Sequence, residues 1–202
     1  MEIVITAVGP DHKGLADPIV HYVTQLGANI SEIQMFDHRE EAIFAMLLRM
    51  SYEFDSPIST SLPDLRKVMG QIGEHKGLSI RVWSAEERAE RPNIAICTTY
   101  RTEPALALLE AIGRGELTAH PAVMIGNRDN CRVIAEKNGI DWHNIADETG
   151  QADDQKMDEL FDRYEVDYVV LARYMRVLPA ESCWKYAGGR IINLHQIGRA
   201  HV

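Results

Sequence analysis

The hydrophobic residues of the first 83 positions follow two different periods. Some stretches alternate apolar and polar residues or are apolar throughout, as in strands, whereas others repeat apolar residues at spacings of three, four and seven, as in helices. The predicted strands are 2–8, 29–36, 42–52 and 78–83, and the predicted helices start at 14 and 61, with apolar stripes that run through 26 and 72. The order βαββαβ predicts a ferredoxin-like unit, in which both helices cover one face of an antiparallel sheet.

From about residue 93 the pattern changes, and short, mostly apolar strands alternate with helices. The predicted strands are 93–97, 122–125, 142–145, 168–171 and 190–194, and the predicted helices are 103–114, 131–138 and 153–164. Apolar strands of this kind are typical of a parallel sheet covered on both faces, so this half predicts an incomplete doubly wound α/β sheet. The charged stretch that ends at Pro92 is typical of a linker, and we expect domains at 1–88 and 89–195.

The last seven residues, 196–202, follow a predicted strand without completing the second domain. Ordinary codons for them can spell CAG ATC GGA AGA GCA CAC GTC, and all but the first base of that string looks like the start of a common sequencing-library adapter. We therefore interpret 196–202 as a non-native tail, the alternative being a natural short tail. A stop codon directly after Val202 in the source locus would contradict this interpretation.

The composition and charge of the chain argue against several classes of function. The 202 residues carry a formal net charge of −9, which provides no electrostatic footprint for nucleic acid. No apolar run approaches the ~20 residues that cross a bilayer, and the start lacks a basic segment followed by an apolar one, so neither a membrane span nor a signal peptide is expected. The three cysteines are far apart and odd in number, which argues against a disulfide framework and favours a reducing cytoplasm.

The strongest candidate for chemistry is the pair Asn193 and His195 at the end of an apolar strand. Residues two apart on a strand project to the same side, and ligands of open parallel sheets bind beyond the carboxyl ends of the strands. A carboxamide N–H and an imidazole N–H can hold the oxyanion of a tetrahedral intermediate, and the imidazole can also transfer protons. This combination suits acyl or formyl transfer or the corresponding hydrolysis. A structural histidine at a strand end is the alternative.

A second candidate is the loop 171–179, which leaves the preceding apolar strand at the same edge. Met175, Val177 and Leu178 provide an apolar wall, and loop backbone groups without ladder partners can bond a flat heterocycle. Arg173 and Arg176 could meet an anionic substrate tail. The alternative is an ordinary connection with solvated arginines.

The run Leu-Ala-Arg-Tyr-Met-Arg-Val-Leu at 171–178, followed by Gly-Arg-Ile-Ile-Asn-Leu-His at 189–195, resembles the folate-dependent formyltransferase family. The resemblance implies that the substrate-binding residues Met175, Arg176, Val177 and Leu178 hold a pterin ring, that Asn193 and His195 are catalytic, and that the folate is substrate, with no cofactor. Gly188-Gly189 is one residue longer than the usual spacing. The family also uses a downstream aspartate that has no counterpart here, which implies that the chain as given is inactive.

The first half carries another resemblance. Gly-Pro-Asp-His-Lys-Gly-Leu at 9–15 and Gly-Ala-Asn-Ile at 27–30 resemble the ACT domain, a regulatory module that often binds amino acids. The resemblance implies an amino-acid effector near Asp11, Gly14, Asn29 and Ile30, and it implies a homo-oligomer. Gly14 would let the chain turn closely into the helix, whose first N–H groups can meet a carboxylate. A plain ferredoxin-like turn is the alternative.

An ACT domain followed by a formyltransferase core resembles the arrangement of formyltetrahydrofolate deformylases, which implies hydrolysis of 10-formyltetrahydrofolate to tetrahydrofolate and formate for purine synthesis. The loop 98–104 contains no glycine, so a backbone nest for the phosphate of an amine substrate is not expected, and water is favoured as the nucleophile. The alternatives are formyl transfer to an amine such as glycinamide ribonucleotide, and a non-catalytic ACT binding module. The histidines show no metal-ligand spacing, so no metal is expected.

Overall fold

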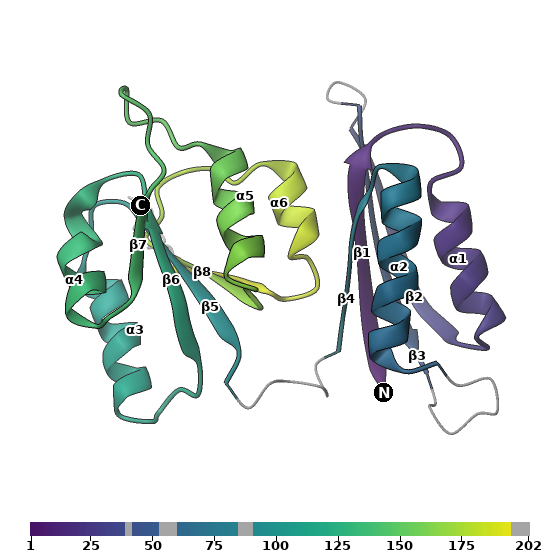
Figure 1. The fold of residues 1–202 in the computed structure, drawn as a ribbon, viewed down its shortest axis with the longest axis horizontal. Helices are drawn as coiled ribbons and strands as arrows, with labels where there is room; N and C mark the ends of the chain where they lie inside the picture. Colours follow the sequence, from purple (N-terminus) through teal and green to yellow (C-terminus); the bar gives the residue numbers. More distant parts are fainter. Residues whose placement is uncertain (39–41, 53–59, 85–90, 195–202) are drawn as a thin grey trace, which may run out of the picture. The chain divides into compact units, whose positions relative to one another are not determined.

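The computed structural model describes residues 1–38, 42–52, 60–84 and 91–194. The chain divides into two compact units, drawn in Figure 1. The first unit joins Met1–Arg88 with Ala180–Gly188, and the second joins Ala89–Pro179 with Gly189–Val202. The predicted domain limits remain predictions, and residues 196–202, for which a non-native origin is predicted, lie outside the described residues.

The first unit is an antiparallel sheet with two helices packed on one face. Its strands run in the order β2-β3-β1-β4. The elements are β1 (Glu2–Pro10), α1 (Ala16–Gln25), β2 (Asn29–His38), β3 (Ile43–Ser51), α2 (Leu62–Lys76) and β4 (Ser79–Trp83). Alternate residues of the central strands, such as Ile5 and Leu48, share a core with Ile19 of α1 and Met69 of α2. The predicted βαββαβ order and antiparallel sheet are confirmed.

A third helix, α6 (Ala180–Lys185), packs on the opposite face of this sheet, against β1, β3 and β4. The Thr6 hydroxyl donates a hydrogen bond of 3.2 Å to the Lys185 carbonyl oxygen. Thr6 alternates along β1 with Ile5 and Ala7, which belong to the core beneath α1 and α2, so its side chain points to the other face. Arg81 of β4 lies over the Tyr186 ring, 4.7 Å from its centroid. Residues 180–188 therefore belong with a sheet that is distant from them in the sequence.

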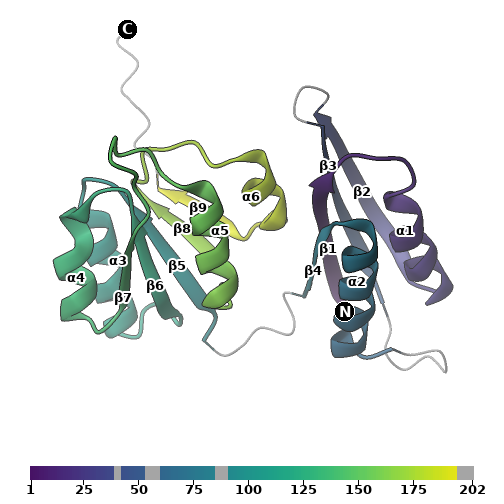
Figure 2. The same cartoon turned by 45° about the horizontal axis from the view of Figure 1, so that its top comes forward.

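The second unit is a parallel sheet whose strands run in the order β7-β6-β5-β8-β9, as Figure 2 shows. The strands are β5 (Asn93–Thr98), β6 (His120–Gly126), β7 (Asp141–Asn144), β8 (Tyr168–Ala172) and β9 (Ile191–Leu194). The helices of this unit are α3 (Glu103–Gly113), α4 (Arg132–Lys137) and α5 (Asp154–Arg163), and a 3-10 turn, η1, covers Asp129–Cys131. All four pairings of neighbouring strands are parallel, as predicted.

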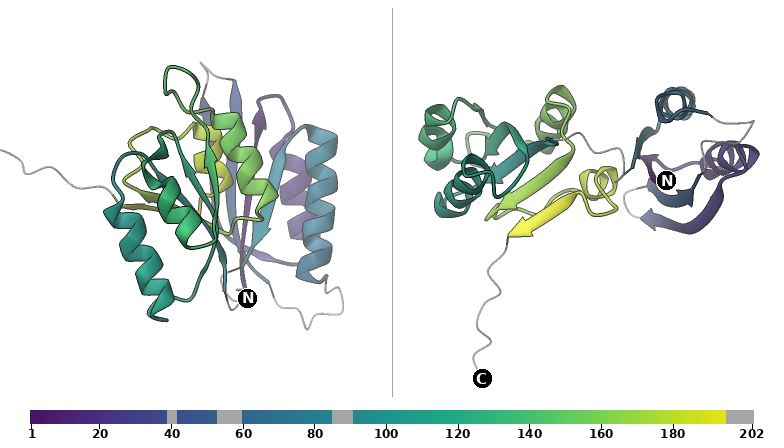
Figure 3. Two further views of the ribbon diagram at one scale, coloured as in Figure 1. Left: turned by 60° about the vertical axis from the view of Figure 1, so that its left-hand side comes forward. Right: turned by 90° about the horizontal axis from the view of Figure 1, so that it is seen from below.

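Helices cover both faces of the second sheet. α3 and α4 pack on one face, where Leu109 and Ile134 share a core with Ile96 and Val170. α5 lies on the other face, as the right-hand view of Figure 3 shows, and its Met157 is fully buried. This doubly wound arrangement explains why the strands are apolar on both sides, and it confirms the predicted α/β fold class. Among the described residues, none of the helices is both long and apolar enough to cross a membrane.

Candidate active site

The candidate site is the carboxyl edge of the second sheet. From β5 the chain passes outward to β6 and β7 on one side, and later returns to β8 and β9 on the other side. The connections therefore diverge between β5 and β8, and the crevice at such a switch point is where open parallel sheets bind ligands. Three segments distant in sequence end at this edge: the residues after Thr98, the loop after Ala172, and the end of β9.

Asn193 lies near the end of β9 and is exposed. In the register it stands beside Leu171 of β8, one position before that strand ends. Its side chain therefore lies on the face away from Val170 and Ala172, which belong to the core beneath α3 and α4. The amide group is thus available at the edge. His195 lies outside the described residues, so its pairing with Asn193 stays a prediction.

The loop after β8 begins with a backbone turn of unusual conformation. Arg173 has a φ of +61°, in the left-handed region that side chains other than glycine rarely adopt. Its N–H donates a hydrogen bond of 3.0 Å back to the Leu171 carbonyl oxygen. This turn ends the strand abruptly and sends the chain across the sheet edge. Strained backbone of this kind persists where surrounding structure holds it, and it concentrates at functional sites.

Beyond the turn, the loop crosses the end of β5. The Met175 N–H donates a hydrogen bond of 3.1 Å to the hydroxyl of Thr99, which is buried. The Met175 side chain is 49% exposed and that of Val177 is 91% exposed. Leu178 is half-buried. The loop therefore presents apolar side chains to solvent at a sheet edge, which is where a flat apolar ligand would find a wall.

Arg176, for which a substrate contact is predicted, uses part of its guanidinium on the protein itself. Its Nη2 donates a 2.6 Å hydrogen bond to the Gly150 carbonyl oxygen. The Asn127 side chain donates to the same oxygen at 3.1 Å. Gly150 is buried, with a φ of +82°, and the Arg128 guanidinium occupies the space where a β-carbon would stand. Arg176 thus ties the loop to the segment that follows β7.

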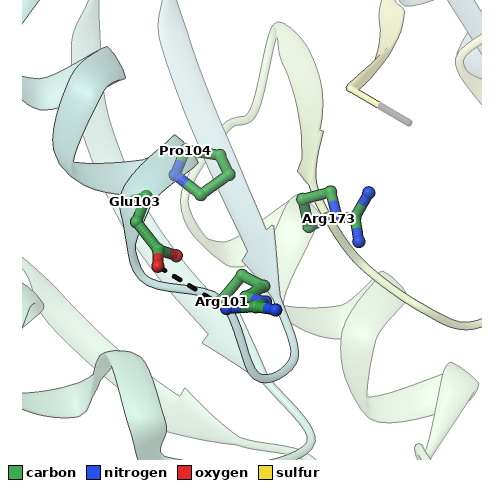
Figure 4. A pocket seen from close by; sticks show the side chains of 4 residues that line it. All are labelled: Arg101, Glu103, Pro104 and Arg173. Atoms are coloured by element: carbon green, nitrogen blue, oxygen red, sulfur yellow. Dashed lines mark ion pairs between the residues drawn. The ribbon is translucent and has the colours of Figure 1, made fainter. Parts of the chain in front are cut away.

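A pocket of about 310 Å³ opens at the switch point. Arg101, Glu103 and Pro104, from the segment after β5, line it on one side, and Arg173 enters from the β8 side (Figure 4). Arg101 and Glu103 form an ion pair of 3.8 Å, with both side chains largely exposed. Neither Arg101 nor Glu103 was predicted as a site residue. Their position in the sequence could have indicated it, because charged residues shortly after a parallel strand lie at the ligand-binding edge.

Burial is the main cause of the pKa shifts of three ionisable groups beside the site. Burial raises the pKa of the Cys97 thiol from 9.0 to about 12, so this thiol stays protonated and unreactive near neutral pH. Burial also raises the pKa of Tyr174, and its hydroxyl has no hydrogen-bond partner among the described residues. The pKa of Asp154 is raised first by burial and then by Asp158 and Asp153. Each of these shifts favours the neutral form of its group.

No cluster of three or more histidine, cysteine or acidic side chains could hold a metal ion within the described ranges.

The predicted effector residues lie at two ends of the first sheet. Asp11 and Gly14 follow the end of β1, whereas Asn29 and Ile30 start β2. Asn29 and Glu2 both pair with Ser51, so β2 begins at the level of the start of β1. Eight strand positions, or about 26 Å, separate that level from the end of β1. A single chain does not bring the two pairs together, and their effector role stays a prediction.

Comparisons with known proteins agree with this architecture. Residues 92–196 match the family model for formyl transferases, and residues 2–81 match the ACT domain. The formyltetrahydrofolate deformylase of Escherichia coli (strain K12) is 33% identical over 195 residues, which are 95% of this chain and 65% of that protein. The formyltetrahydrofolate deformylase of Bacillus subtilis (strain 168) is 29% identical over 189 residues, 92% of this chain and 61% of its own length.

A crystal structure of a formyltetrahydrofolate deformylase from Pseudomonas putida KT2440 overlaps 96% of this chain and 68% of its own, with a TM-score of 0.49 and 22% identity. The chain spans slightly less than two thirds of the length of the curated relatives it matches.

Proposed function

The chain belongs to the formyl transferase family, and from this premise we propose that it hydrolyses 10-formyltetrahydrofolate to tetrahydrofolate and formate. One observation carries the proposal: the carboxyl edge of the second sheet joins an exposed amide, that of Asn193, with a loop that presents Met175 and Val177 to solvent. Relatives that match over nearly the whole chain bear the name formyltetrahydrofolate deformylase, which supports the same reaction.

In the proposed reaction, a water oxygen bonds to the formyl carbon and the bond from that carbon to N10 of the folate breaks. Asn193 and the protonated His195 donate N–H groups to the oxyanion that forms on the formyl oxygen. His195 then delivers its proton to N10 as the folate leaves, and it regains a proton from the water that has become part of formate. Met175, Val177 and Leu178 contact the pterin ring, and the backbone groups of their loop bond its polar edge. A preorganised oxyanion donor of this kind accounts for about 10²–10³ in rate.

Water is the proposed acceptor because the segment after β5 is poorly built for a phosphate. A phosphate nest needs successive free backbone N–H groups, and Pro104 has none to offer. Glu103 adds a carboxylate at the same place and already pairs with Arg101.

The pocket also favours a second candidate function, transfer of the formyl group to an anionic amine. Arg101 and Arg173 line the same volume of about 310 Å³, and two guanidinium groups are suited to a phosphate or carboxylate. The two candidates predict different products from one assay, because only hydrolysis releases formate without an acceptor.

The experiment measures formate and tetrahydrofolate released from 10-formyltetrahydrofolate by the full-length gene product, with and without glycinamide ribonucleotide. Asn193→Ala is expected to lower kcat by about 10²–10³. Ile192→Ala is the matched control, since Ile192 is its half-exposed neighbour on the opposite face of β9 and should leave kcat unchanged. Equal turnover by the Asn193 variant and the unsubstituted enzyme would refute the assignment, and acceptor-dependent turnover would favour the transferase.

We also propose that the first unit binds an amino acid and that the protein is a cytoplasmic homo-oligomer. The match of residues 2–81 to the ACT domain supports this role. A panel of the twenty amino acids, screened for a rise in Tm, tests it, because a ligand that binds the native state stabilises it. Absence of any shift at millimolar concentrations would argue against an effector site.

A further inference from the structure

The Thr99 hydroxyl is a polar group in a buried position, where it needs a hydrogen-bond partner. Thr99 is 2% exposed and directly follows β5, whose preceding residues are buried and mostly apolar. A buried hydroxyl destabilises a fold unless it is hydrogen-bonded. Here it accepts the N–H of Met175, 76 residues further along the chain, at 3.1 Å. The side chain of one sheet strand thus supports the main chain of the candidate substrate loop.

The loop needs such support because it has left the sheet. β8 ends at Ala172, and the left-handed turn at Arg173 removes the following residues from the ladder. Their backbone N–H groups must find other partners. Packing holds the neighbouring Tyr174, which is 3% exposed, but not the Met175 side chain, which is 49% exposed. The hydrogen bond to Thr99 holds the Met175 main chain beyond the point where this packing ends.

A second contact restrains the other side of the loop. Arg176 donates to the carbonyl oxygen of Gly150, and the Asn127 amide holds that same oxygen from beneath. Adjacent residues, Met175 and Arg176, are thus fastened to two different segments of the sheet edge. A loop fastened on both sides is preformed, so a ligand does not have to order it on binding.

We propose that Thr99 is a positioning residue for the hydrolysis proposed above, on which this inference rests. Its hydroxyl holds the Met175 main chain so that the side chains of 175–178 stand ready as one wall of the slot for a flat heterocycle. Thr99 touches no reacting atom, so its contribution should appear in KM for the folate, with kcat nearly unchanged.

The first test concerns the hydrogen bond and needs no activity. In the 202-residue chain, amide hydrogen exchange of Met175 is followed by NMR in Thr99→Val, which keeps the shape and loses the hydroxyl. Exchange is expected to accelerate about tenfold, because a hydrogen bond of ordinary strength is lost. Thr99→Ser keeps the hydroxyl and should exchange near the original rate. Thr98→Val is the matched control, because Thr98 is equally buried while Met175 donates to Thr99.

The core amide of Ile96 reports whether each variant is folded, and Thr99→Ala is examined if the valine variant is not. Unchanged exchange at Met175 in a folded Thr99→Val or Thr99→Ala chain would overturn the inference, because the loop would then be held without this bond.

The second test concerns the role and uses the full-length gene product. Thr99→Val is expected to raise KM for 10-formyltetrahydrofolate about three- to tenfold, with Thr99→Ser restoring it and Thr98→Val leaving it unchanged. Faster exchange without a change in KM would overturn the positioning role. Absence of hydrolysis by the unsubstituted enzyme would overturn the proposed function and the kinetic part of this inference, while amide exchange would still decide whether Thr99 holds the loop.

Discussion

The two predicted sites differ in the strand ends that they use, and this difference decides whether one sheet edge can hold each of them. In the first sheet, β1 and β2 run in the same direction on either side of β3, but Asp11 follows the end of β1 whereas Asn29 starts β2, and about 26 Å separates these two levels along the strands. In the parallel second sheet, all five strands end at one edge. Thr99, Arg173 and Asn193 therefore reach the same edge although long stretches of sequence separate them.

The lesson is that the end of the strand at which a residue lies outweighs closeness in sequence. Asn29 is 18 positions from Asp11 and lies at the other end of its sheet, whereas Thr99 is 76 positions from Met175 and bonds to it. A parallel sheet collects residues at one edge because every crossover returns the chain to the same end. Within the first sheet, the two pairs of predicted effector residues stay apart.

The largest expected effect is the loss of stability when a core side chain of either unit is shortened. Ile5 and Ile96 are fully buried on the central strands of the first and second sheets. Ile5→Ala and Ile96→Ala should each lower the free energy of unfolding of its own unit by about 2–5 kcal/mol, because each leaves a cavity. Urea titration with NMR signals from both cores measures the two units separately. A loss below about 1 kcal/mol at either site would contradict the packing described.

The next largest effect is a loss of stability at alkaline pH, which should be confined to the second unit. Burial raises the pKa of Cys97 from 9.0 to about 12, so folding favours the neutral thiol. The contribution of the buried thiol to the free energy of unfolding is fully present below pH 9, and it is lost as the pH rises from 9 towards 12. The folding constant should fall about tenfold for each pH unit in that window. Subtracting the profile of Cys97→Ala isolates this slope from other titrating groups, and identical slopes would show that the thiol ionises freely.

Helix caps provide a smaller effect that should be equal in both units. The Ser61 hydroxyl accepts the N–H of Asp64 at the start of α2, at 3.2 Å. The Asp153 carboxylate accepts the N–H of Lys156 at the start of α5, at 3.0 Å. Ser61→Ala and Asp153→Ala should each cost about 1 kcal/mol, whereas Ser61→Thr and Asp153→Asn keep an acceptor. Thermal unfolding measures all four, and alanine variants as stable as the conservative ones would exclude capping at these positions.

The smallest effect is expected on the surface. Arg132 and Glu136 of α4 form an exposed ion pair of 2.8 Å. Arg132→Ala should change Tm less than either cap variant, and added salt should shrink the difference further, because solvent and ions screen such pairs. A larger loss than at Asp153 would mean that α4 depends on its surface charges more than on its buried Ile134 and Ala135.

Much of the fold could be predicted because it depends on short-range patterns. The spacing of Ile3 and Ile5 indicates the face of the first sheet that α1 and α2 cover, and the continuous apolar run of β8 indicates two covered faces in the second sheet. The ends of the helices were harder to predict from the sequence. The apolar stripe of α2 runs through Ile72, yet the helix continues to Lys76 and stops where Gly77 adopts a φ of +68°. A left-handed glycine ends a helix independently of its apolar face.

The candidate site could be predicted in part. The position of Asn193 at a strand end and the loop at 175–178 follow from strand order, whereas Arg101 and Glu103 became part of the edge only when β5 was placed beside β8. Helix α6 was not predicted from the sequence either. Its six residues are too few to show a period, and its contacts are with strands about 100 or more positions away.

Residue order was sufficient for the element sequence, the two sheet types and the edge at which ligands would bind, because each depends on periodicity over a few turns or strand positions. Folding in three dimensions decided which residues meet. The bond from Met175 to Thr99, the attachment of Arg176 to Gly150 and the packing of α6 beneath Thr6 join segments that share no local pattern. Such contacts arise when separate elements are packed and their buried polar groups must find partners, and that requirement is met in space, not along the chain.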